Sequence, residues 1–171
     1  MEIFRGKRLW IEKRTIRLPN GIEREKVIVH PSNAVAILPV HDDRCKLLRQ
    51  YRYAIDQYIF EVPAGTMEKD EDPSETARRE LIEETGFRAK TILPKGFIFT
   101  TPGYTDEKIF LFEARDLSPS MEYGKDDDEI IEVIDIATSD LNDMIINGSI
   151  VDAKTICLIH RCLGAELCIR V

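Results

Sequence analysis

Hydrophobic residues in the first part of the chain follow the spacing of β-strands. The segment RTIRLPNGIEREKVIVHP, residues 14–31, predicts an extended pair of strands around a turn at residues 19–21. The run NAVAILPV at 33–40 is continuously apolar, which is typical of a strand buried on both faces. CKLLRQYRY at 45–53 and QYIFEVPAG at 57–65 predict two more strands. The chain therefore begins as a sheet.

A helix is predicted from about Pro73 to Thr85, because both of its ends carry boundary signals. Asp72 suits the N-cap, Pro73 suits the first helical position, and Glu75 can reach back as in a capping box. Gly86 can adopt the left-handed conformation that ends a helix. These residues predict the helix without reference to the rest of the fold.

Strands and then helices are predicted for the rest of the chain. GFIFTT at 96–101, KIFLFEAR at 108–115 and EIIEVIDIA at 129–137 have strand character. Helices are predicted at about 139–147 and 152–163. This order indicates an α+β protein of one domain, in which helices pack on a mixed sheet.

Composition and charge narrow the class of protein. With 171 residues, 43% of them hydrophobic, the chain can bury the core of one ordinary domain. The net charge of -7 argues against a large nucleic-acid surface, which needs clustered Lys and Arg. No segment has the length of a membrane span, and the start MEIFRGKRLW lacks the apolar core of a signal peptide. We expect a cytoplasmic protein that binds neither nucleic acid nor membrane.

The cysteines and histidines indicate neither a zinc site nor a nucleophilic triad. The four cysteines include no C-x-x-C pair and no matching histidine set, so buried free thiols are expected in place of a zinc site. The three histidines lie in no Ser or Cys motif, which argues against a nucleophilic triad.

The predicted helix at 73–85 carries an unusual acidic face. Residues three and four apart share one side of a helix, so Glu80, Glu83 and Glu84 converge. Two like charges about 4 Å apart repel by roughly 4 kcal/mol at an effective dielectric of about 20, unless a cation is present. Oxygen ligands alone select Mg²⁺, Mn²⁺ or Ca²⁺. The alternative is a solvated face with Arg78 and Arg79 as ordinary ion-pair partners.

The spacing of residues 65–87 favours the metal site. Gly65, Glu71, Arg79-Glu80, Glu83-Glu84 and Gly86 satisfy the pattern G-x5-E-x7-R-E-U-x-E-E-x-G-U, with Leu81 and Phe87 as the apolar U. The sequence thereby resembles the Nudix hydrolases, which cleave nucleoside diphosphates linked to another moiety with Mg²⁺ or Mn²⁺. The resemblance implies a Nudix-type α/β/α sandwich with a mixed central sheet.

The resemblance also assigns roles within this segment. It implies that Glu80 and Glu84 ligate the metal, and that Ala64 adds its backbone carbonyl. Glu83 would contact metal directly or through water, and Arg79 would orient Glu83 or its neighbours through hydrogen bonds. Glu71 would support the loop.

Further matches are similar to the ADP-ribose pyrophosphatase branch of this family. Pro102 stands sixteen residues after Gly86 and opens the turn PGYTDE, in which Gly103 and Glu107 would contact substrate, Glu107 in its own site or in that of a partner subunit. RQYRY matches the strand on which Arg52 would face the substrate phosphates. Each match has a structural alternative. Pro102 could be only a turn residue, Glu107 a solvated loop end and Arg52 a surface arginine.

The acidic stretch KDDDE at 125–129 has two interpretations. Such a loop can be merely solvated. In the resembled branch, the equivalent loop brings a metal ligand, here Glu129, and a catalytic base, here Asp127. Glu is more common at the base position, so Asp128 or Glu129 can take that role instead.

These observations predict metal-dependent hydrolysis of ADP-ribose to AMP and ribose 5-phosphate, with Mg²⁺ or Mn²⁺ as cofactor. The alternatives are another nucleotide sugar or a dinucleotide, such as GDP-mannose, or a nucleotide sensor without catalysis. By resemblance, we expect residues 1–33 to be N-terminal antiparallel strands that form a homodimer, and 34–171 to be the catalytic domain.

Overall fold

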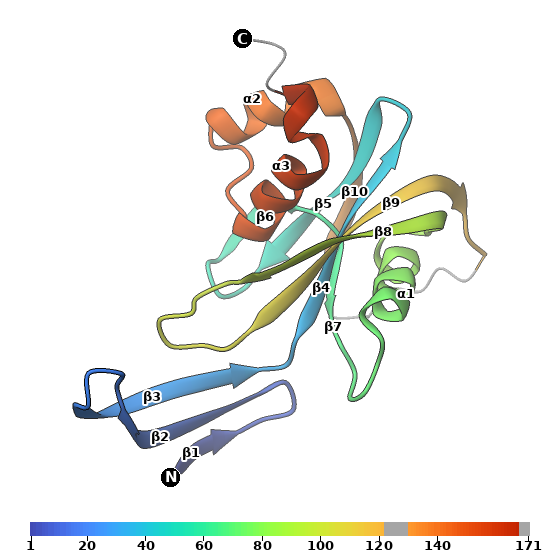
Figure 1. The fold of residues 1–171 in the computed structure, drawn as a ribbon. Coiled ribbons are helices and arrows are strands. Elements are labelled where there is room, and N and C mark those ends of the chain that lie inside the picture. The colour runs from blue at the N-terminus through green and yellow to red at the C-terminus, as the bar shows by residue number, and fades with distance from the viewer. Residues whose placement is uncertain (122–129, 168–171) are drawn as a thin grey trace.

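The computed structural model describes residues 1–121 and 130–167, and of residues 165–167 the backbone alone (Figure 1). In these ranges the strands form two sheets, one of three strands and one of seven. Helices cover the larger sheet from both sides (Figure 1). The predicted α/β/α sandwich, preceded by antiparallel strands, is confirmed.

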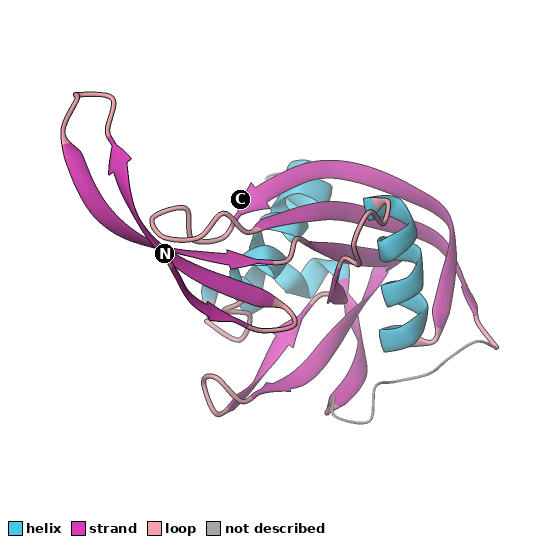
Figure 2. Ribbon diagram, turned by 90° about the horizontal axis from the view of Figure 1, so that it is seen from below, coloured by secondary structure: helices cyan, strands magenta, loops and turns pink. Residues whose placement is uncertain are grey.

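The first sheet is antiparallel and consists of β1 (Glu2–Arg5), β2 (Leu9–Arg17) and β3 (Glu23–Pro31). β2 and β3 pair from end to end, around the turn predicted at residues 19–21. Figure 2 shows this sheet projecting from the body of the molecule.

The second sheet has the main order β10-β5-β4-β9-β8. β4 (Ala34–His41) runs parallel to β9 (Lys108–Pro119), whereas the other pairs are antiparallel, so the sheet is mixed. The remaining members are β5 (Arg44–Arg52), β6 (Gln57–Glu61), β7 (Ala64–Thr66), β8 (Phe87–Phe99) and β10 (Ile131–Ala137).

The continuous apolar run predicted a strand buried on both faces, and β4 is that strand. Val35 and Ile37 pack on one side in a cluster with Ala77 and Leu81 of α1 (Pro73–Thr85). Ala36, Leu38 and their neighbours pack on the other side against α3 (Ala153–Leu167). Because successive side chains of a strand point to opposite faces, one apolar run supplies two cores.

α1 has the bounds that the sequence predicted. The Asp72 carboxylate accepts a hydrogen bond from the backbone N–H of Ser74 at 2.8 Å, and Pro73 occupies the first turn. Gly86 ends the helix with φ 75°, and its N–H donates to the carbonyl of Ile82. Among the hydrogen bonds of the described residues, the reciprocal bond predicted from Glu75 is missing, and the Asp72 carboxylate accepts from the N–H and the hydroxyl of Ser74.

Other elements differ from the prediction in length. β8 begins at Phe87, because its first half pairs with the end of β9, with a register shift between Pro94 and Phe97. The first C-terminal helix is a short 3₁₀ turn, Thr138–Asp140, followed by α2 (Leu141–Ile146). Among the described residues, no helix combines the length and the apolar character needed to cross a bilayer.

Candidate active site

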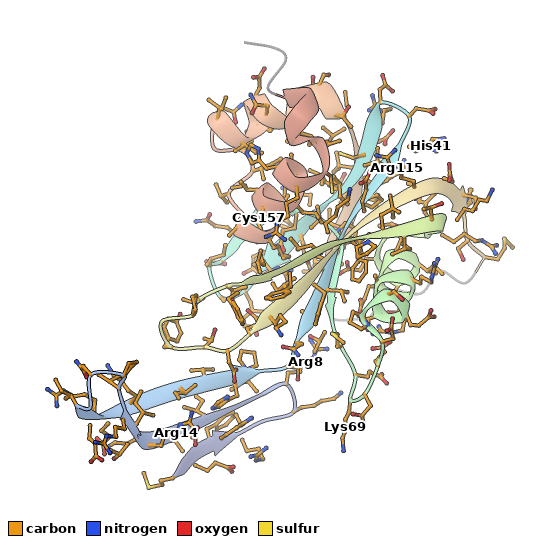
Figure 3. The ribbon with its side chains drawn as sticks, in the orientation of Figure 1. Arg8, Arg14, His41, Lys69, Arg115 and Cys157 are labelled. Atoms are coloured by element: carbon orange, nitrogen blue, oxygen red, sulfur yellow. The ribbon has the colours of Figure 1, made fainter. Side chains whose placement is uncertain are left out.

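A pocket of about 1290 Å³ lies beside the acidic face of α1. Its walls combine β4 and β7, the loop that leads into α1, the turn between β1 and β2, and the first turn of α3. Figure 3 labels two of its lining residues, Arg8 on the β1–β2 turn and Lys69 in the loop before α1. The volume suffices for a ligand of nucleotide size.

Arg79 is the centre of the ion pairs on the acidic side of the pocket. Its Nε and Nη2 lie 3.2 Å from the two carboxylate oxygens of Glu71. Its Nη1 donates to Glu80 at 2.7 Å and to Glu83 at 2.9 Å. One guanidinium thus fixes three carboxylates, including the contact with Glu83 that the family resemblance predicts.

These ion pairs shift the pKa values of both partners. Hydrogen bonds from Arg79 are the main cause that lowers the pKa of Glu71 to about 2. Burial lowers the pKa of Arg79, but the hydrogen bonds and charges of Glu71, Glu80 and Glu83 outweigh it and raise the pKa above its usual value. Glu71 also accepts the backbone N–H of Glu68 at 2.9 Å, so it supports the loop as predicted.

The two predicted metal ligands, Glu80 and Glu84, pack against the loop at β7. Glu84 is 4% exposed, and its Oε2 accepts the backbone N–H of Ala64 at 2.8 Å. A Cβ on Gly65 would lie 1.9 Å from the carboxyl carbon of Glu80, so only glycine leaves room for that carboxylate. The loop and helix are therefore shaped around these two side chains.

The oxygen donors suit a hard divalent cation, since Glu80, Glu83, Glu84 and the loop backbone meet at one pocket. Among the side chains that the structure describes, in residues 1–121 and 130–164, no three of His, Cys, Asp or Glu form a group that could hold a metal ion. Arg79 binds Glu80 and Glu83, while Ala64 binds Glu84. Glu129, the third predicted ligand, lies outside the described residues, as do Asp127 and Asp128.

The pocket is also lined by basic side chains. Arg52, at the end of β5, lines it and forms a bidentate pair with Glu61 at 2.6 and 2.7 Å. Lys154 of α3 lines it too and donates to the same carboxylate. Burial raises the pKa of Glu61, but the hydrogen bond from Arg52 and the charge of Lys154 lower it overall.

The turn between β8 and β9 reaches the pocket through only one of its predicted residues. Glu107 lines the pocket and accepts a hydrogen bond from Thr100 at 2.5 Å. Gly103 is exposed and is not part of the pocket wall formed by a single chain. The same turn contacts β3, where the Val29 N–H donates to the carbonyl of Tyr104 and His30 pairs with Asp106 at 2.6 Å.

The ion pair of Glu61 and Lys154 is one feature that the sequence did not suggest. Lys154 lines the pocket, and Glu61 is buried behind it. They lie 93 positions apart and meet where the segment after β6 is bonded to the first turn of α3, through the Val62 N–H and the Thr155 hydroxyl. One local signal was present, because Glu61 is an acidic residue in an otherwise apolar strand end, IFEVP.

Comparison with known proteins identifies the class. The sequence profile of the NUDIX domain matches residues 30–157, so the chain belongs to the Nudix family. A solved structure described as "Crystal structure of ADP compounds hydrolase" superposes with a TM-score of 0.85 at 24% identity and covers 97% of this chain and 92% of that one. That likeness shows the fold.

Characterised relatives match most of the chain. "ADP-ribose pyrophosphatase" of Bacillus subtilis (strain 168) is 37% identical over 90% of this chain and 84% of its own length. "Methanol dehydrogenase activator" of Bacillus methanolicus is 34% identical over 91% and 85%. "GDP-mannose pyrophosphatase" of Cronobacter sakazakii is 32% identical over 81% and 78%.

Proposed function

We propose that this chain hydrolyses the diphosphate of ADP-ribose to AMP and ribose 5-phosphate. The observation that carries the proposal is one pocket that is lined both by the carboxylates of the Nudix pattern and by basic side chains, among them Arg52 and Lys154. The similarity to an ADP-ribose pyrophosphatase over 90% of the chain supports this substrate.

The acidic wall is proposed to hold Mg²⁺, or Mn²⁺ in its place, through Glu80, Glu84, the Ala64 carbonyl and Glu129. The bound cation neutralises diphosphate charge and lowers the pKa of a bound water. Glu83 helps to hold this site, and Arg79 keeps Glu80 and Glu83 in place through the hydrogen bonds described above.

In the proposed reaction, the oxygen of a water molecule forms a bond to one phosphorus and the bridging P–O bond breaks. Asp127 is the proposed base that takes the proton of the water, with Asp128 and Glu129 as the other candidates. Arg52 donates to the phosphate oxygens. Glu107 and Gly103 are proposed to contact the rest of the substrate, Glu107 in its own site or in that of a partner subunit.

We further propose that residues 1–33 form the dimer contact of a homodimer, beside a catalytic domain at 34–171. The first sheet exposes apolar side chains, among them Phe4 at 53% and Val27 at 50%, which a second chain would cover. A cytoplasmic location, without nucleic acid or membrane as partner, stays a prediction from the sequence.

GDP-mannose is the second candidate substrate, because a relative of 32% identity is a GDP-mannose pyrophosphatase. The chemistry at phosphorus would be the same, and only the contacts to base and sugar would change. A nucleotide sensor is less well supported, because the set of Arg79, Glu80, Glu83 and Glu84 is complete and binding alone does not need it.

A substrate panel tests the proposal. The chain is incubated with Mg²⁺ and ADP-ribose, GDP-mannose or a diadenosine polyphosphate, and nucleotide and sugar phosphate products are measured. We expect ADP-ribose to have the highest kcat/KM and to release AMP. Equal or faster cleavage of GDP-mannose would overturn the substrate assignment, and the absence of any cleavage would favour the sensor.

A further inference from the structure

His30 of β3 joins the first sheet to the turn between β8 and β9, residues 100–107. Its side chain is 15% exposed. Its Nδ1 lies 2.6 Å from a carboxylate oxygen of Asp106, and its Nε2 lies 3.3 Å from a carboxylate oxygen of Glu12 on β2. The ring also stacks on Trp10, with the two planes 12° apart, which fixes its orientation. Both nitrogens of one imidazole therefore face carboxylates.

Only a protonated His30 can bond both carboxylates. A neutral imidazole carries one N–H donor and one acceptor nitrogen, whereas an imidazolium carries two donors. An ionised carboxylate can only accept, so a neutral ring would turn a nitrogen lone pair towards either Asp106 or Glu12. Histidine is the side chain that changes its charge between about pH 5 and 8, so the two bonds depend on pH in that range.

The charged groups around His30 differ in how they are compensated. Glu12 lies 3.2 Å from Nε of Arg14 on the same strand, and Arg5 of β1 lies over the indole that stacks on His30, 5.1 Å from its centroid. Glu12 therefore has a second cation when His30 is neutral. Asp106, in the part of the chain that the structure describes, has no ion-pair partner other than His30.

The turn that His30 holds carries Glu107, which lines the pocket. A neutral bond also holds this turn, because the Val29 N–H donates to the Tyr104 carbonyl at 2.9 Å, and neither group titrates at neutral pH. The ion pair at Asp106 does titrate, and it adjoins Glu107 in the chain. Its loss would loosen the position of Glu107 while the start of the turn stays in place.

We infer that protonated His30 is a positioning residue for Glu107 and makes substrate binding depend on pH. This inference rests on the proposed function, in which Glu107 contacts the substrate. When His30 loses its proton, Asp106 loses its ion pair in either tautomer of the ring, and the turn is held less firmly. Because coupling between two binding events is reciprocal, substrate binding must in turn draw a proton onto the imidazole.

The experiment compares His30→Asn and Asp106→Asn with the wild type from about pH 6 to 8.5, the range in which a histidine loses its proton. Binding of a methylene-bridged ADP-ribose that cannot be cleaved is measured by calorimetry with Mg²⁺. Buffers of different ionisation enthalpy give the protons taken up on binding. Asp106 is 59% exposed at its side chain, so Asp106→Asn should fold even if His30→Asn does not.

We expect the Kd of the wild type to rise about fivefold or more across this range, as coupling between two binding events typically does. The wild type should also take up protons on binding near neutral pH. Both variants lack the titrating ion pair, so their Kd should change less than about twofold and their proton uptake should be smaller. A wild-type Kd that does not rise with pH would overturn the inference.

His41→Asn is the matched control. His41 ends β4, its side chain is 58% exposed and lies 3.8 Å from Asp42, and neither residue lines the pocket. This variant should keep the pH dependence and the proton uptake of the wild type. If His30→Asn and Asp106→Asn keep them too, another group is responsible and His30 has no positioning role.

The outcome also separates this inference from the proposed function. Cleavage of GDP-mannose in place of ADP-ribose overturns the substrate assignment alone, and KM for GDP-mannose is then measured over the same pH range. The wild type should again lose affinity as the pH rises, whereas His30→Asn should not. A KM for the preferred substrate that changes equally in both overturns the role of His30 alone.

Discussion

At the scale of single residues, Arg79 organises the acidic wall. Its guanidinium binds Glu71, Glu80 and Glu83 at once, which removes most of the repulsion that three neighbouring carboxylates would otherwise cause. The same contacts make the stability of the folded chain depend on pH, because a carboxylate with a lowered pKa favours the folded state only while it is ionised.

Glu71→Gln tests this dependence. The pKa of Glu71 is lowered from 4.5 to about 2 in the folded chain. Its contribution to stability is therefore fully present above about pH 4.5 and is lost as the pH falls towards 2. Urea denaturation should show the wild type more stable by about 1 kcal/mol at pH 7, after allowance for solvent screening. A difference that is as large at pH 2.5 as at pH 7 would exclude the ion pair as its cause.

Gly65→Ala tests the fit between the loop and Glu80. The added Cβ would displace the Glu80 carboxylate, which lies at the end of a flexible side chain, while the backbone stays in place. We expect activity with Mg²⁺ to fall roughly a hundredfold, as a displacement of about 1 Å can cause. The melting temperature should change little. Full activity would show that Glu80 does not need its observed position.

At the scale of elements, α1 is fixed by its own ends. Asp72 and Pro73 begin the helix, and Gly86 ends it in a left-handed conformation. Because these signals are local, the bounds of this helix could be read from the sequence. The carboxylates that are proposed to bind metal therefore lie on a helix whose length is set by local signals.

Gly86→Ala should lower the free energy of unfolding by about 1 kcal/mol, since an L-residue with a side chain is strained at φ 75°. Gly164→Ala is the matched control. Gly164 lies inside α3 with open space around a Cβ, so alanine should stabilise the chain by up to about 1 kcal/mol. Denaturation curves of the two variants should shift in opposite directions, and a shift in the same direction would contradict this explanation.

The sequence predicted local features well and distant pairings poorly. The buried strand β4 was clear from its apolar run. The first half of β8, residues 87–94, is not among the predicted strands, although Phe87, Ala89 and Thr91 alternate with Arg88 and Lys90 as in a half-buried strand. The acidic side of the pocket lies within one segment of the chain, so the sequence predicts it. The pair of Glu61 and Lys154 joins two distant segments, so the sequence does not predict it.

At the scale of the whole molecule, the first sheet is a separate layer that touches the body near the pocket. His30 stacks on Trp10 with ring centroids 3.9 Å apart, and it also pairs with Asp106 in the turn before Glu107. The rest of this sheet leaves apolar side chains exposed. Its position suits a contact with a second chain close to the substrate.

Light scattering tests the proposed dimer. The full chain should have about twice its mass of 19.7 kDa. A chain without residues 1–28, which keeps Val29 and His30, should have the mass of one chain. A full-length protein that is monomeric at micromolar concentration would contradict the dimer, and a dimeric shortened chain would place the contact elsewhere.

The central claim is that the acidic wall holds a divalent cation that the hydrolysis of ADP-ribose requires. The most direct test is AMP release from ADP-ribose with Mg²⁺ by the wild type, Glu84→Gln and Glu75→Gln. The Glu84→Gln side chain keeps an oxygen for the Ala64 N–H, so the fold should persist, while Glu75 is exposed on the same helix and away from the pocket. We predict rapid AMP release by the wild type and Glu75→Gln, and a loss of at least about a hundredfold for Glu84→Gln. Near-normal turnover by folded Glu84→Gln would contradict the account.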